Sequence, residues 1–179
     1  IQWDVSAAEK GGYEHFMMKE IHEEPKAVRD TVNPRIRDGE VFIHELRMTP
    51  EQIAKIHKIF IIACGSAYHA GVTGKYVIES MARIISQSGE TADTLAAMRE
   101  AKRQGVRTLA VVNVVGSSIA READDVLYTW AGPEIAVATT KGYISQLAAL
   151  YLLGLHFGRT LGRIKDQDYH EMIEELQVL

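Results

Sequence analysis

Residues 86–94, Ser-Gln-Ser-Gly-Glu-Thr-Ala-Asp-Thr, carry the side chains of this sequence that are best suited to bind a phosphate. They place hydroxyls, an amide and a glycine at the approach to a predicted helix. The first N–H groups of a helix have no partner within it, and the helix dipole is positive there, so an anion is stabilised. Ser86, Ser88 and Thr91 would add hydroxyl donors, and Gly89 would let the backbone approach the ligand. Such a segment can bind phosphate without a Lys or an Arg.

An ordinary capped helix would have much the same sequence. Ser88 is suited to the N-cap position before a helix over residues 94–104. Glu90 and Asp93 form an acidic pair, but complementarity to the helix dipole explains Glu90 without a catalytic role. The segment alone therefore leaves both interpretations open.

Strand and helix patterns alternate along the chain from residue 58 onward. Apolar runs predict strands over residues 58–63, 84–85, 107–112 and 126–129. Apolar spacing and possible caps predict helices over residues 66–81, 94–104 and 140–157, the last capped by Thr139 or Thr140. This alternation predicts an α/β fold, a three-layer sandwich in which helices flank a parallel sheet on both faces.

The first fifty residues do not follow this alternation. Apolar spacing predicts a helix over residues 7–30, with a kink or break at Pro25. Residues 33–50 contain two prolines and a glycine, which predicts a linker with a short extended piece at residues 41–43.

The junction at Arg83 is unusual. A helix ending near Arg83 would meet the strand at Ile84 and Ile85 with no loop, although helix-to-strand loops usually have roughly 2 to 6 residues. Two residues are also few for a central strand, whose usual length is about 5 to 6. We therefore expect that residues are missing from the chain near positions 83–85.

In a parallel sheet of this kind, ligands bind beyond the carboxyl ends of the strands. Three turns at such positions offer small or hydroxyl side chains near the start of a helix. They are residues 64–66, residues 86–91 and residues 137–141. Their agreement favours a phosphorylated small molecule, since neither a Gly-x-Gly-x-x-Gly fingerprint after a strand nor a Walker loop is present.

Composition excludes several classes of protein. The chain has 179 residues, 46% of them hydrophobic, which is enough for one domain with a sizeable core. A net charge of -4 with dispersed basic residues argues against nucleic acid, and no apolar run is long enough to span a membrane. The single cysteine, Cys64, excludes an internal disulfide and suits a cytoplasmic location.

Histidine and cysteine give little support for other chemistry. His15 and His22 lie seven apart with no third ligand at a matching spacing, so we predict no metal site. His69 could approach a ligand, although a structural role in the first helical turn is favoured. Cys64 ends a predicted buried strand and has no nearby base, which favours a packed side chain over a nucleophile.

Five segments together resemble a known family. They are residues 8–17, residues 64–71 (Cys-Gly-Ser-Ala-Tyr-His-Ala-Gly), residues 86–94, residues 113–118 (Asn-Val-Val-Gly-Ser-Ser) and residues 137–141 (Val-Ala-Thr-Thr-Lys). The combination resembles the sugar isomerase (SIS) domain, with its flavodoxin-like fold, and in particular the first SIS lobe of the glucosamine-6-phosphate synthases. Members of that family make glucosamine 6-phosphate from fructose 6-phosphate and glutamine.

The resemblance implies a role for individual residues. The phosphate of fructose 6-phosphate or glucosamine 6-phosphate would be held by Ser66, Ser86, Gln87, Ser88, Gly89 and Thr91. The sugar would contact Val137, Ala138 and Thr139. Two positions depart from the family pattern, because Ala67 stands where a hydroxyl residue is usual and Thr139 replaces a common serine. The resemblance implies no cofactor.

The resemblance also implies that this chain is part of a longer protein. Residues 1–50 would be a helix and linker leading in from a glutaminase domain, residues 51–165 the SIS domain, and residues 166–179 the start of a helix leading to a second SIS lobe. The family has a strand and a loop where Arg83 and Ile84 meet, and its acid-base residues lie outside the matched segments. We therefore expect no catalytic residue in this chain, a homodimer, and no nucleic-acid or membrane partner.

Two other functions remain as alternatives. A non-catalytic SIS module could sense a phosphosugar, although the residues 8–18 favour the synthase. A single-lobe phosphosugar isomerase would need its own base, and only His69 or Glu90 could serve.

Overall fold

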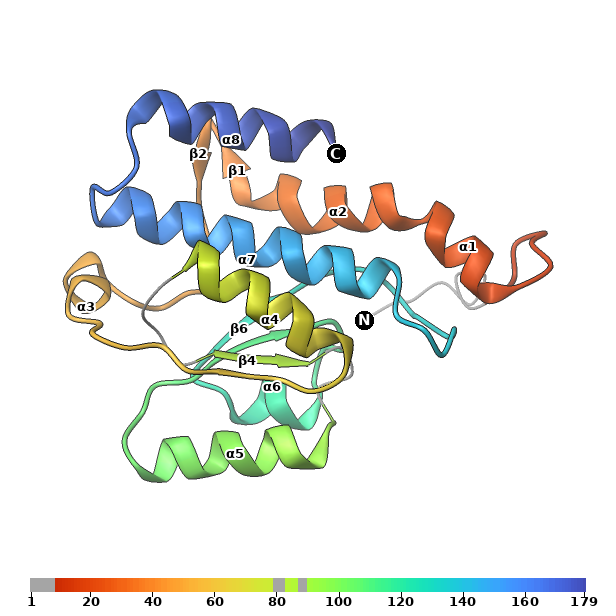
Figure 1. Cartoon of the computed structure of the whole chain (residues 1–179), viewed down its shortest axis with the longest axis horizontal. Helices are drawn as coiled ribbons and strands as arrows, with labels where there is room; N and C mark the ends of the chain where they lie inside the picture. Colours follow the sequence, from red (N-terminus) through yellow and green to blue (C-terminus); the bar gives the residue numbers. More distant parts are fainter. Residues whose placement is uncertain (1–8, 79–82, 87–89) are drawn as a thin grey trace.

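A four-stranded parallel sheet forms the centre of the molecule (Figure 1). The computed structural model describes residues 9–78, 83–86 and 90–179, and only the backbone of residues 83–86. The strands are β3 (Ile61–Ile62), β4 (Arg83–Ser86), β5 (Leu109–Val112) and β6 (Asp125–Tyr128), in the spatial order β3-β4-β5-β6. The predicted α/β fold with a parallel sheet is confirmed.

Helices cover both faces of this sheet, as Figure 1 shows. One face carries α4 (Ser66–Val77) and α7 (Lys141–Thr160), and the other carries α5 (Ala92–Arg103) and α6 (Ser118–Glu122). The helices α2 (Glu24–Val32) and α8 (Asp166–Val178) pack on the outer side of α7 and add a layer to the predicted sandwich. The remaining elements are α1 (Phe16–His22), a 3-10 turn (Asn33–Arg35), the hairpin strands β1 (Ile36–Arg37) and β2 (Glu40–Val41), and α3 (Pro50–Ala54).

Two hydrophobic clusters lie on the two faces of the sheet, one toward α4 and α7 and the other toward α5 and α6. The four residues of β5 are at most 3% exposed, as expected for a strand covered on both faces. Buried side chains of α7, such as Leu152 and Leu153, share a cluster with Val32 of α2 and Ile173 of α8. The segments before residue 51 and after residue 165 are therefore packed into the same core as the sheet.

The N-terminal helix differs from its predicted extent. Helix α1 ends at His22 and α2 begins at Glu24, so the break predicted near Pro25 is confirmed, whereas the helix begins at Phe16 and not at the predicted residue 7. Proline is tolerated in the first turn of α2 because the N–H it lacks has no partner there. Helix α3 begins at Pro50, the last residue of the predicted linker, and was not predicted; a capping box between Thr49 and Gln52 starts it.

Strand β3 is much shorter than the predicted strand over residues 58–63. It forms one edge of the described sheet and pairs there with β4 alone. Phe60 just before it is 50% exposed, and the ammonium of Lys58 lies 4.6 Å from the centre of its ring. A strand covered on both faces was therefore the wrong prediction for this segment.

The connection from α4 to β4 also differs. The helix ends at Val77, well before Arg83, and residues 78–82 separate it from the strand. This spacing lies within the range of roughly 2 to 6 residues that is usual between a helix and a strand. The structure thus removes the loop-length argument for missing residues near positions 83–85, which stay a prediction.

Candidate functional site

Three turns predicted to bear chemistry lie at the same edge of the sheet. Since β3, β4, β5 and β6 are parallel, their carboxyl ends lie at one edge, where β3 leads into α4, β4 into α5 and β6 into the loop before α7. Figure 1 shows the starts of α4 and α5 at one end of the sheet. Two helix N-termini with positive dipole ends are therefore available to one anion.

The turn from β3 to α4 presents Ser66 to solvent. Gly65 precedes the helix with φ +60, a left-handed conformation that favours glycine. Ser66 is the first helical residue and is exposed, whereas Ala67 is 5% exposed and faces the core. Cys64 was predicted to be packed, but it is exposed because it follows β3 at the sheet edge, with its Sγ 4.0 Å from the hydroxyl of Thr94 on α5.

The predicted phosphate segment is described in part. Ser86 ends β4, and Gln87, Ser88 and Gly89 lie outside the described residues. Helix α5 begins at Ala92 with Thr91 at its N-cap position, so Ser88 is not the N-cap that was predicted. The described parts of the segment thus lie where the sequence placed them, at the carboxyl end of β4 and the start of α5.

Glu90 has a role that differs from the predicted one. Its carboxylate accepts a hydrogen bond from the N–H of Ser118, the first residue of α6, at 2.8 Å. The hydrogen bonds from the side chain and backbone of Ser118 hold the pKa of Glu90 below its ordinary value, and Arg121 adds to this effect. Glu90 therefore stays ionised and ties the approach to α5 to the neighbouring helix.

Asn113 fixes the segment that follows β6. It is 4% exposed and ends β5. Its amide nitrogen donates to the carbonyl of Gly132 at 2.6 Å, and its amide oxygen accepts from the N–H of Ala131 at 2.9 Å. The loop that leads to α7 is thus attached to the carboxyl edge of the sheet.

Carboxylates from two segments hold that loop, residues 132–140. Glu20 of α1 accepts from the N–H groups of Ile135 and Ala136 at 2.6 and 3.1 Å. Glu134 accepts from the N–H groups of Thr140 and Gly142 at 2.9 and 3.1 Å, and so caps the start of α7. Thr140 is the N-cap residue, one of the two residues predicted for that position.

The predicted sugar-binding residues lie between these two attachments. Val137 is fully exposed, Ala138 is exposed and Thr139 is partly buried. The loop lies at the same end of the sheet as the starts of α4 and α5 in Figure 1. The structure therefore brings this turn to the side of the molecule that carries Ser66 and Thr91.

Buried charges lie beneath the loop. Lys141 is 2% exposed, and its ammonium pairs with the carboxylate of Glu23 at 2.5 Å. Lys19 pairs with the other oxygen of Glu23 at 3.4 Å. A cation at the first residue of a helix opposes the dipole, so Glu23 and the capping carboxylate of Glu134 offset an unfavourable position.

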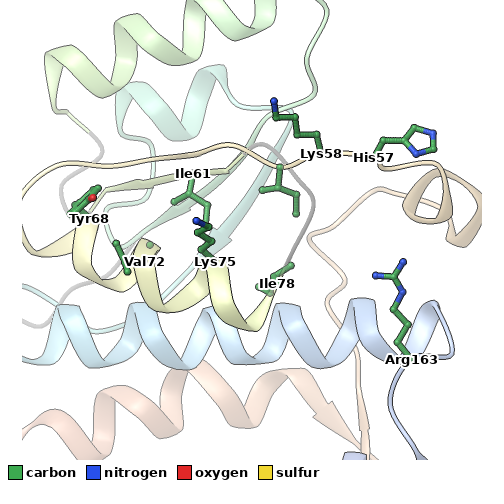
Figure 2. A pocket seen from close by; sticks show the side chains of 10 residues that line it. His57, Lys58, Ile61, Tyr68, Val72, Lys75, Ile78 and Arg163 are labelled. Carbon is green, nitrogen blue, oxygen red and sulfur yellow. The ribbon is translucent and has the colours of Figure 1, made fainter.

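The cavities of the described chain lie elsewhere. Figure 2 shows a cavity of about 510 Å³ on the side of α4 that faces the open edge of the sheet, lined by Tyr68, Val72, Lys75 and Ile78 of α4 and by His57 and Lys58. None of the predicted site residues lines it. Another cavity of about 580 Å³ lies beyond β5 and β6 and includes Asn113, Trp130 and Gly132.

Within the described residues, no cluster of three His, Cys, Asp or Glu side chains could hold a metal, and no helix is long and apolar enough to cross a membrane.

Comparison with known proteins gives a consistent result. A family model described as "SIS domain" matches residues 84–156. The glutamine–fructose-6-phosphate aminotransferase (isomerizing) of Caldanaerobacter subterraneus subsp. tengcongensis is 55% identical over 205 residues, covering all of this chain and 34% of that protein. Its counterpart from Mycobacterium tuberculosis is 45% identical over 201 residues, covering 96% of this chain and 32% of that protein. The chain thus spans about a third of the length of these curated relatives.

Solved structures agree with the sequence relatives. The C-terminal domain of glucosamine-fructose-6-phosphate aminotransferase from Francisella tularensis superposes with a TM-score of 0.88 at 36% identity, over 95% of this chain and 55% of that one. The sugar isomerase domain of the RpiR transcription factor from Sphaerobacter thermophilus has a TM-score of 0.61 at 15% identity, over 92% of this chain and 100% of that one, and shows the fold alone.

The alignments also bear on the predicted missing residues. The match of 205 positions to the Caldanaerobacter protein is longer than the 179 residues of this chain. That relative therefore has residues without a counterpart here. The difference in length supports the prediction of missing residues without locating them.

Proposed function

The chain belongs to the SIS-domain proteins and corresponds along its whole length to a part of the glutamine–fructose-6-phosphate aminotransferases, and from this premise we propose that it binds a sugar phosphate. The phosphate would lie between the starts of α4 and α5, and the sugar against the turn before α7. The proposed phosphate-binding residues are Ser66, Ser86, Gln87, Ser88, Gly89 and Thr91, and the proposed sugar-binding residues are Val137, Ala138 and Thr139.

The observation that carries this proposal is the convergence of two helix N-termini at one edge of the sheet. Ser66 is the first residue of α4, and Thr91 is the N-cap residue of α5. The first N–H groups of a helix have no partner within the helix, and together with the positive ends of two dipoles they favour an anion at this position. A phosphate ester can therefore be bound by neutral donors, and its sugar can extend toward residues 137–139.

The whole protein's activity follows as a proposal from the names of the relatives. It would convert fructose 6-phosphate and glutamine to glucosamine 6-phosphate and glutamate, without a cofactor. This chain would supply substrate binding and no catalytic residue. A glutaminase domain would precede residues 1–50, and a second SIS lobe would follow residues 166–179. We also expect a homodimer in the cytoplasm.

The two alternatives are less well supported. The relatives at 45% to 55% identity are enzymes by name, which favours the synthase over a phosphosugar sensor. A single-lobe isomerase would need Glu90 or His69 as its base. Glu90 is a weak candidate, because its lowered pKa and its bond to Ser118 make it a poor proton acceptor.

Calorimetric titration with fructose 6-phosphate and with glucosamine 6-phosphate tests the proposed site. Loss of one hydrogen bond to a charged group costs about 1.5 to 3 kcal/mol, so Ser88→Ala and Thr91→Ala should each raise the Kd about ten- to a hundredfold. Thr73→Ala is the matched control, because its hydroxyl bonds to His69 on α4, away from the proposed site. Unchanged affinity in both Ser88→Ala and Thr91→Ala would refute the phosphate site.

A further inference from the structure

Glu20 is a buried carboxylate that joins two distant parts of the chain. It is 2% exposed on α1, and both of its oxygens face the loop before α7. Its Oε1 accepts from the N–H of Ile135 at 2.6 Å and from that of Ala136 at 3.1 Å. A buried carboxylate requires such donors, since an unpaired one would be strongly destabilising.

These two bonds end where the exposed turn begins. Val137 follows Ala136 directly, and Glu134 fixes the other end of the turn through the N–H groups of Thr140 and Gly142. Residues 137–139 are therefore a short exposed segment between two attached ends. Without Glu20, the loop would keep its attachment to Asn113 at Gly132 and to Glu134 at the start of α7, but the N–H groups of Ile135 and Ala136, directly before the turn, would lose this partner.

The neighbouring charges do not provide a substitute for Glu20. The ammonium groups of Lys19 and Lys141 pair with Glu23, on the other side of the loop attachment. Glu20 instead directs its charge to backbone N–H groups, which are fixed dipoles and orient the peptide units that carry them. Its role is thus specific to the conformation of residues 135–136.

We propose that Glu20 is a positioning residue that sets the conformation of the sugar-binding turn, residues 137–139. The proposal rests on the proposed function, in which this turn contacts the sugar. It adds a residue of α1, outside the SIS match over residues 84–156, to the construction of the site. The proposed site thus depends on Glu20 as well as on Ser66, residues 86–91 and residues 137–139.

Affinity for two probes separates this role from a general effect on folding. Inorganic phosphate uses only the starts of α4 and α5, whereas fructose 6-phosphate also uses the turn. Glu20→Ala should weaken fructose 6-phosphate about tenfold and leave the Kd for inorganic phosphate unchanged. Glu20→Gln should recover most of the affinity, because its amide oxygen can accept both N–H groups. Glu14→Ala, whose carboxylate is 89% exposed on the preceding segment, is the matched control.

The outcomes are distinguishable when the titrations are followed by amide NMR shifts. Equal weakening of both probes, or no change in either, would overturn the positioning role. If Glu20→Ala does not fold, Glu20→Asp decides in the same way, because its carboxylate is one methylene shorter and cannot reach both N–H groups. If the unsubstituted chain binds fructose 6-phosphate no better than inorganic phosphate, the proposed sugar contact fails, and this inference fails with it. Failure to bind either probe refutes the proposed function itself.

Discussion

At the scale of single residues, Asn113 connects three groups near the site through its side chain. It joins the end of β5 to the backbone of Ala131 and Gly132 through its donor and its acceptor. A third bond from the hydroxyl of Thr129 reaches the same amide oxygen at 3.3 Å. The side chain thus replaces backbone pairing where the sheet ends and the loop begins.

Substitution of Asn113 should therefore lower stability. Asn113→Ala leaves the carbonyl of Gly132 and the N–H of Ala131 without these partners in a buried place. Each such group costs about 1 to 3 kcal/mol, so the free energy of unfolding should fall by at least about 2 kcal/mol in urea denaturation. Asn33→Ala, at an exposed position, should change it by less than about 0.5 kcal/mol. Equal effects of the two substitutions would contradict the role given to Asn113.

Residue types and their local order predicted the turns but not these connections. Ser66, Ser86 and Thr91 were located correctly because strand ends and helix starts are local features of a sequence. Glu20 and Glu90 were not assigned their partners, because the N–H groups that they contact are 115 and 28 residues away. A backbone N–H carries no side-chain signal, so nothing in the sequence marks it as the partner of a distant carboxylate.

At the scale of elements, the close packing of α4 against α7 supports the face of the sheet that carries the site. Gly154 of α7 lies against the end of α4, and a Cβ at this position would be 2.5 Å from Cγ1 of Val77 and 3.4 Å from its carbonyl oxygen. Gly74 of α4 is less restricted, because its Cβ would meet the flexible end of Leu150 at 3.0 Å. Both glycines lie where α4 packs against α7, but a side chain at Gly74 should be tolerated better than one at Gly154.

The two substitutions to alanine should differ accordingly. Alanine raises helix propensity by about 1 kcal/mol, while overpacking costs about 1 to 3 kcal/mol. Gly154→Ala should lower the free energy of unfolding by about 1 to 2 kcal/mol, because Val77 is stiff and its carbonyl cannot move. Gly74→Ala should be close to neutral, because the Leu150 side chain can rotate away. Chemical denaturation of both variants measures this, and a larger loss in Gly74→Ala would contradict the packing described.

Element prediction succeeded where the pattern is long and failed at edges. Helices α5 and α7 were predicted to within a few residues because their apolar spacing extends over several turns. Strand β3 was overestimated, since an apolar run alone does not reveal that the strand lies at an edge of the sheet. Helix α3 was not predicted, although Thr49 and Gln52 form a capping box at its start.

At the scale of the whole molecule, the segments outside the SIS match are packed as firmly as the sheet. Tyr169 of α8 is fully buried, and its hydroxyl accepts from the N–H of Val41 at 2.7 Å. Next to this contact lies His156 of α7, whose pKa is lowered below its ordinary value by burial, with partial opposition from a hydrogen bond to the backbone of Val41. Because this imidazole is buried, the stability of the packing between α7 and β2 should depend on the pH of the solution.

The sign of this coupling follows from linkage. In the unfolded chain His156 takes up a proton near its ordinary pKa of about 6.5, whereas in the folded chain it does so only at lower pH. The stability contributed by the neutral imidazole is therefore fully present above about pH 7 and is lost as the pH falls below about 6.5.

The protonation of carboxylates changes stability in a lower range of pH. The pKa of Glu122 is held low by its hydrogen bonds from Arg99, so its contribution is lost only below about pH 4.3.

Urea denaturation at several values between about pH 5.5 and 7.5 tests the histidine, because this window includes the ordinary pKa of histidine and lies above the ordinary pKa of carboxylates. The free energy of unfolding should rise with pH in the unsubstituted chain, and the slope should be smaller in His156→Gln. His57→Gln, in which the replaced histidine is exposed, is the matched control and should keep the full slope. An equal slope in the unsubstituted chain and in His156→Gln would show that this histidine does not couple the α7 and β2 layers to pH.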